Sequence, residues 1–150
     1  AVVSGVGFLS FVSYSRKQIL VQAKSDVKQA VDLARFNALS GVKPASCGAS
    51  DTLTSYTISF CINNNPSCSA AIPNGTGYQV HASCGALNPL ILSKKLPQNV
   101  TFIDGDLPPR CQDIVFNSVN PVVSGGPCNV KISGYSSTIT FSIDSQGYAY

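Results

Sequence analysis

The strongest constraint on this chain is a change in the spacing of its apolar residues near residue 41. From Leu20 onward, apolar residues recur at steps of three and four, and polar residues fall between them. These apolar positions are Leu20, Ala23, Val27, Ala30, Val31, Ala34 and Ala38. Such spacing places them on one face of an α-helix. Gly41 favours a helix end and Pro44 prevents continuation, so we predict a helix over residues 1–40.

The opening of this helix differs from the remainder. Residues 1–14 are uncharged and mostly apolar or small, and Arg16 and Lys17 follow them. A helix of this length spans about 21 Å, whereas a bilayer core is roughly 30 Å thick. The segment therefore cannot cross a bilayer by itself. It has the form of the second half of a transmembrane segment, with Arg16 and Lys17 at the membrane boundary. The alternatives are a partial signal peptide and an ordinary buried helix.

A helix of forty residues would be about 60 Å long, but a head of roughly 110 residues has a radius of gyration near 13 Å. The head cannot cover the whole helix. We therefore expect the second half to pack on the head through its apolar face and the first half to project.

Beyond Pro44 the apolar residues alternate with polar ones, which predicts antiparallel strands. The candidate strands are 56–62, 78–83, 100–103, 113–116, 130–132 and 138–143. Residues 144–147 (DSQG) predict a turn that lets 148–150 pair back. The predicted fold class is α+β, with a long N-terminal helix packed on a disulfide-stabilised antiparallel β-sheet head. One domain covers residues 1–150, and residues 45–150 form the head.

Composition limits the functions to consider. The chain has 150 residues, 44% of them hydrophobic, which is enough for one core. A net charge of +3 is too small to indicate nucleic acid by itself. The single histidine, His81, and the absence of a C-x-x-C pair argue against zinc. We expect no metal, no cofactor, no small-molecule substrate and no enzymatic activity. His81 occupies an outward strand position, so a solvated histidine is favoured over a catalytic base.

Six cysteines, an even number at wide spacing, indicate a disulfide framework and an oxidising compartment. They are Cys47, Cys61, Cys68, Cys84, Cys111 and Cys128. Six cysteines allow 15 pairings, and all remain open at this point.

Four short segments, taken in order, carry a resemblance to a known family. They are 32–39 (DLARFNAL), 96–102 (LPQNVTF), 113–116 (DIVF) and 137–143 (STITFSI), the last followed by Gly147. In this order, after an apolar helix that continues into an amphipathic one, they resemble type IV pilins and pseudopilins. The similarity is greatest to the minor pseudopilins of type II secretion and to related minor type IV pilins.

The resemblance implies a structural subunit, major or minor, that polymerises into an extracellular filament. The apolar half-helix of such subunits lies in the inner membrane before assembly and in the filament core afterwards, and the heads form the outer wall. Its partners are copies of itself or other pilin subunits. The residues that would occupy the membrane or the core here are Ala1, Val2, Val3, Val6, Phe8, Leu9, Phe11 and Val12.

The resemblance also bears on the cysteines. A Cys111–Cys128 bond would resemble the C-terminal disulfide loop of a pilin, and Cys61–Cys68 would close the turn-rich INNNPS segment. Cys47–Cys84 is then the remaining pair. These three bonds together are one of the 15 possible sets.

A second function is a minor pilin that acts as a DNA-binding or adhesive tip module. Phosphate contacts could come from Lys94, Lys95, Arg110 and Lys131. Against this, the C-terminal QGYAY carries no positive charge. Lys94 and Lys95 fit equally well as a solvated charge pair on an edge strand that discourages aggregation.

Overall fold

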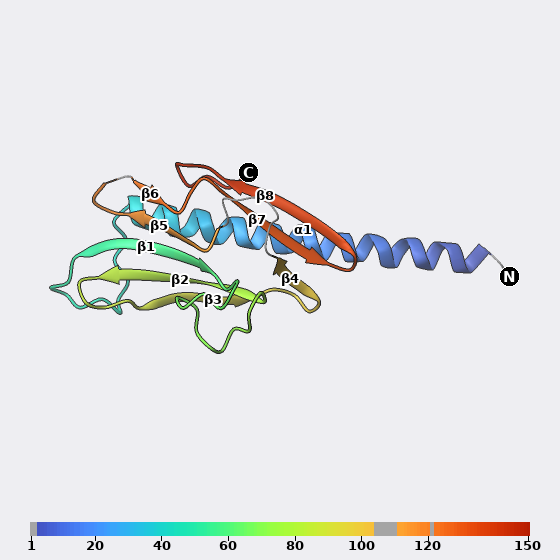
Figure 1. The fold of residues 1–150 in the computed structure, drawn as a ribbon, viewed down its shortest axis with the longest axis horizontal. Coiled ribbons are helices and arrows are strands. Elements are labelled where there is room, and N and C mark those ends of the chain that lie inside the picture. The colour runs from blue at the N-terminus through green and yellow to red at the C-terminus, as the bar shows by residue number, and fades with distance from the viewer. Residues whose placement is uncertain (1–2, 104–110, 121) are drawn as a thin grey trace.

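A long helix and two antiparallel sheets make up the chain (Figure 1). The structure, a computed structural model, describes residues 3–103, 111–120 and 122–150, and side chains from Phe11 onward. Helix α1 (Val3–Leu39) packs on both sheets through its C-terminal part. Sheet A has the strand order β3-β2-β1-β5-β6, and sheet B has the order β4-β7-β8. The strands are β1 (Leu53–Phe60), β2 (Gly77–Cys84), β3 (Leu90–Lys95), β4 (Val100–Ile103), β5 (Asp113–Asn117), β6 (Val123–Ser124), β7 (Cys128–Gly134) and β8 (Ser137–Ile143).

The apolar stripe of α1 forms the centre of the core. All seven positions that the sequence pattern places on one face are buried, from Leu20 to Ala38. The helix ends in a Schellman arrangement, in which the Val42 amide donates to the Asn37 carbonyl and the Gly41 amide to the Ala38 carbonyl. Gly41 has the positive φ of 63° that this ending requires. Buried Tyr56 then fixes the exit of the chain, because its hydroxyl donates to the Val42 carbonyl at 2.8 Å.

Each sheet has an apolar face toward α1 and a polar face away from it. In sheet A, Ile58 and Val80 are buried, whereas Thr57 and His81 alternate with them on the opposite face. The two sheets meet through Phe102 of β4, whose ring lies 5.5 Å from the ring of Phe60 in an edge-to-face arrangement. One core therefore joins helix, sheet A and sheet B.

Three disulfides connect the loops of the head. They are Cys47–Cys84, Cys61–Cys68 and Cys111–Cys128, the three pairs considered in the sequence analysis. The first ties the segment after α1 to the end of β2. The third ties the residues before β5 of sheet A to β7 of sheet B. Each such bond typically contributes about 2–4 kcal/mol to stability by restricting the unfolded chain.

The α+β class, the antiparallel strands and the disulfides are thus confirmed, but the head contains two sheets where one was expected. The sheet divides because β4 pairs with β7, whereas β5 returns to pair with β1. Period-two patterning shows which face of a strand is buried, but it does not select the neighbouring strand. The expected return of residues 148–150 is confirmed, since Tyr150 and Ser142 exchange two backbone hydrogen bonds.

Two glycines with positive φ allow the cost of backbone strain to be compared with the cost of a steric clash. Gly147 has φ 79°, and an added Cβ would collide with the ring of buried Phe116; Gly41 has φ 63°, and an added Cβ would meet nothing. We expect Gly41→Ala to cost about 1–2 kcal/mol from left-handed strain alone. Gly147→Ala should cost roughly 1–3 kcal/mol more, because Phe116 must move. Urea unfolding of both variants measures the difference, and equal losses would contradict the close approach of Gly147 to Phe116.

Candidate functional site

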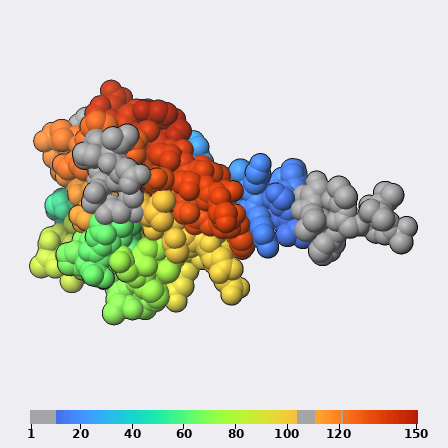
Figure 2. Space-filling model, turned by 45° about the vertical axis from the view of Figure 1, so that its right-hand side comes forward, coloured from blue at the N-terminus to red at the C-terminus, as the bar shows by residue number. Residues whose placement is uncertain are grey.

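The N-terminal part of α1 extends beyond the head. We call Val3–Ser15 the projecting segment. Contacts of α1 with the head include Arg16, whose guanidinium lies 5.6 Å from the centre of the Tyr135 ring, and Ile19, which packs against the core. In the projecting segment, Phe11 is 69% exposed and Tyr14 is 63% exposed. Figure 2 shows the described part of this helix standing clear of the head.

Apolar side chains are also exposed along the part of α1 that packs on the head. They are Val21, Leu33, Phe36 and Leu39. On the same turns, Ala30, Ala34 and Ala38 are buried. Near the end of the helix the alanines thus face the head, whereas Leu33 and Phe36 are exposed. Together with Phe11 and Tyr14 of the projecting segment, the four exposed residues are the apolar side chains of α1 that this subunit leaves exposed among the described residues.

The eight residues assigned by resemblance to the membrane or filament core are only partly described. Ala1 and Val2 lie outside the described residues. Val3, Val6, Phe8 and Leu9 lie on the helical backbone, but their side chains are outside the description. Phe11 is exposed, and Val12 is half-buried. Over the part of the chain that the structure describes, no helix is long and apolar enough to cross a membrane.

Of the four basic residues proposed for DNA contact, the three that the structure describes lie on two different sheets. Lys94 lies on the edge strand β3, where its ammonium pairs with Asp26 of α1 at 3.1 Å. Lys95 follows it and is exposed. Lys131 lies on β7 in the other sheet, and Arg110 lies outside the described residues. The edge-strand position matches the expectation for Lys94, although this residue serves the contact between β3 and α1.

Beside this ion pair, the buried Tyr78 hydroxyl donates to the backbone carbonyl of Asp26 at 3.2 Å. Burial, with the negative charge of Asp26 as a smaller cause, raises the pKa of Tyr78 well above its usual value. The hydroxyl therefore remains protonated and continues to donate at any pH the protein meets. It holds β2 against the helix together with the Lys94–Asp26 pair.

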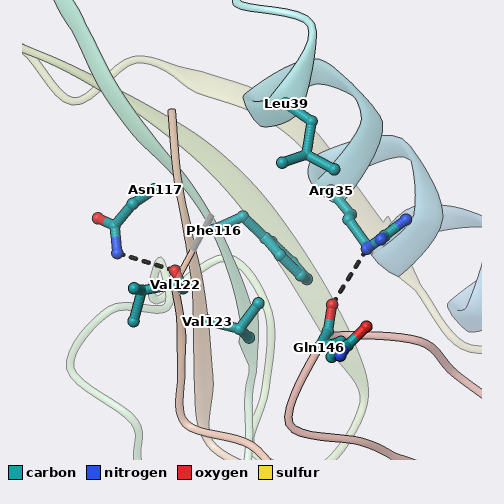
Figure 3. Close-up of a pocket in the computed structure, with 7 residues that line it drawn as sticks. All are labelled: Arg35, Leu39, Phe116, Asn117, Val122, Val123 and Gln146. Carbon is teal, nitrogen blue, oxygen red and sulfur yellow. Dashed lines mark hydrogen bonds between the residues drawn. The ribbon is translucent and has the colours of Figure 1, made fainter. Parts of the chain in front are cut away.

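A cavity of about 310 Å³ lies where the end of α1 meets β5, β6 and the last turn of the chain (Figure 3). Its lining residues are Arg35, Leu39, Phe116, Asn117, Val122, Val123 and Gln146. Arg35 Nε donates to the Gln146 carbonyl at 3.1 Å, and its guanidinium lies 3.7 Å from the centre of the Tyr148 ring. Among the described residues, the lining contains no carboxylate, histidine or cysteine. Its one cation serves to join the C-terminal turn to the helix.

A second cavity, of about 300 Å³, lies on the outward face of sheet A. It is lined by Thr57, Ser59, Ser67, His81, Ser83 and Asn88. His81 was expected to be solvated, but it is half-buried, and its Nε2 is buried without a hydrogen-bond partner among the described residues. The alternation of the strand indicated the outward face correctly. It could not indicate that the Cys61–Cys68 loop, which contributes Ser67, folds over this face.

The described residues around this cavity do not form a Ser/His/Asp relay. The nearest candidate acid, Asp113, accepts hydrogen bonds from Asn65 Nδ2 at 2.8 Å and from Ser67 Oγ at 3.0 Å. His81 Nε2 has no such bond to Asp113 within the described chain. A Ser/His/Asp arrangement requires the base to be oriented by the acid, and here the acid is used to hold a loop.

Comparisons with known proteins do not assign a family. No family model matches the chain, and neither a curated protein nor a solved structure matches it. Residues 3–103, 111–120 and 122–150 also contain no group of three or more histidine, cysteine or acidic residues placed to hold a metal ion.

The contact of Arg35 with Tyr148 can be tested by a charge-conserving change. Arg35→Lys keeps the charge but removes the planar stack and the Nε bond to Gln146, so we expect a loss of about 1 kcal/mol in the free energy of unfolding. Arg16→Lys is the matched control, because its guanidinium lies farther from its ring, at 5.6 Å. We expect that variant to be unchanged. Urea unfolding measures both, and an unaltered midpoint for Arg35→Lys would show that the C-terminal turn is held by other contacts.

Proposed function

We propose that this chain is a structural subunit, major or minor, of an extracellular filament of the type IV pilin and pseudopilin kind, and that it polymerises through α1. The observation that supports this most is the exposed apolar surface of the helix. Phe11 and Tyr14 of the projecting segment have no cover from the head, although both rings are large. A lone subunit in water would keep this surface hydrated.

The driving force for assembly would be burial of that surface. Removing apolar area from water is worth roughly 25 cal/mol per Å². One head cannot reach the projecting segment, because a helix of 37 residues is about 55 Å long and the head packs on its C-terminal part only. Other copies of the helix can cover it along its whole length. Before assembly, the inner membrane would cover the same surface, as the family resemblance implies.

The head suits a position on the outside of such a filament. Its three disulfides form in oxidising surroundings, and its outward sheet faces carry mainly hydroxyl and amide side chains. The partners in this proposal are copies of the chain or other subunits of the same kind. The corresponding location is the inner membrane before assembly and a cell-surface filament afterwards.

The proposal predicts that one charge in the projecting segment blocks assembly without unfolding the head. In Phe11→Asp, a carboxylate would have to be buried between helices, which is strongly unfavourable. We expect this variant to remain monomeric after detergent removal, whereas the unaltered chain forms elongated assemblies. Sedimentation velocity and negative-stain electron microscopy measure the outcome. Circular dichroism and an unchanged unfolding midpoint verify that the head is folded.

The matched control places the same charge on the head. Val119 is 76% exposed in a head loop, so Val119→Asp changes an equally exposed apolar residue away from α1. It should assemble as the unaltered chain does. If Phe11→Asp assembles normally, or if both variants fail equally, polymerisation through the projecting segment is wrong.

A further inference from the structure

The outward face of sheet A carries a polar cavity that the proposed filament role leaves unused. Its lining comes from three separate parts of the head: Thr57 and Ser59 from β1, His81 and Ser83 from β2, and Ser67 and Asn88 from loops. Among these lining residues, Ser59 is completely buried, whereas Ser67 and Asn88 are exposed. Its volume of about 300 Å³ lies at the lower end of the range for small-molecule sites.

Two polar groups in this cavity lack partners. Ser59 Oγ and His81 Nε2 are both buried and make no hydrogen bond within the described chain. Buried polar groups in folded proteins are nearly always paired, so each exception calls for an explanation. Both residues line one cavity from adjacent strands, so an occupant that shifts their cover slightly could satisfy both groups together.

The hydrogen bonds already present limit what that occupant can be. Ser67 Oγ donates its proton to Asp113, and Ser83 Oγ donates its proton to Asn88 Oδ1 at 2.9 Å. These two serine oxygens therefore offer only lone pairs to the cavity, while the Asn88 amide nitrogen offers donors. The occupant must then both donate and accept. The adjacent Asp113 carboxylate would repel an anion such as phosphate.

The charges of the lining side chains also restrict the ligand. None of the six lining side chains is a carboxylate, lysine or arginine. A charged ligand would lose its hydration without gaining a counter-charge. Hydroxyl groups donate and accept at once, so a neutral ligand with several neighbouring hydroxyls fits the whole lining. We infer that this cavity is a binding site for a neutral saccharide unit, held by Ser59, His81 and Asn88. No aromatic ring lines it, so we expect a dissociation constant in the millimolar range, typical of a few hydrogen bonds.

The single histidine of the chain provides the probe. The imidazole signals of His81 in a proton NMR spectrum belong to one residue only. The full chain is kept monomeric in a detergent without a sugar headgroup and titrated with glucose, galactose, mannose and N-acetylglucosamine, and separately with inorganic phosphate. We expect saturable shifts of the His81 signals with at least one sugar and none with phosphate. Saturation by phosphate alone, or no saturable shift with any of the four sugars, would overturn the inference.

Variants separate binding from folding. Ser59→Ala removes an unpaired buried hydroxyl, so it should leave the unfolding midpoint unchanged or raise it, yet weaken sugar binding roughly tenfold. Asn88→Ala lies on an exposed loop and should weaken binding by roughly three- to tenfold with the fold intact. Thr138→Ala, on the exposed face of sheet B, is the control and should bind as the unaltered chain does. Unaltered affinity in both Ser59→Ala and Asn88→Ala would place any sugar contact outside this cavity.

Discussion

The close contact between the small-residue stripe of α1 and the two sheets supports the remainder of the structure. Ala23, Ala30, Ala34 and Ala38 allow the strands to approach the helix backbone, and Leu20, Val27 and Val31 fill the space between them. Each sheet is polar on the side away from the helix, and its apolar side is covered by the helix. The edge-to-face contacts of Phe102 with Phe60 and Tyr78 join the sheets only because both already lie on the helix.

This arrangement uses only one side of one part of the helix. Ala30, Ala34 and Ala38 allow a close approach on the buried side near the end of α1, whereas Phe36 and Leu39 are exposed there. Several apolar side chains of α1 are therefore left exposed, among polar ones such as Gln22 and Gln29. In the proposed filament, these exposed side chains would be available to neighbouring subunits.

Sequence periodicity was sufficient to predict the helix and most strands, but not which strands pair with one another. The helix stripe, its end at Gly41 and most strands follow directly from spacing, because burial of one face imposes a period of 3.6 or 2. Strand β3 was not among the candidate strands, because LILSKK shows no alternation, and only Lys94 and Lys95 suggested an edge strand there. Strand β6 was not predicted and has only two residues. The polar cavity could not be predicted either. It depends on the β1–β2 register, which pairs Thr57 with His81, and on a disulfide loop that brings Ser67 over this face.

The placement of the cavity on sheet A has a consequence for any assembly through α1. The helix contacts the apolar faces of the sheets, and strand alternation directs Ser59 and His81 to the opposite face. Copies that associate along the outer surface of α1 would meet on the helix side of the head. The cavity would then remain open on the side away from the helix, and every subunit of a filament would carry one. Weak binding at each site could therefore add up along a filament, because linked sites raise the effective concentration of their neighbours.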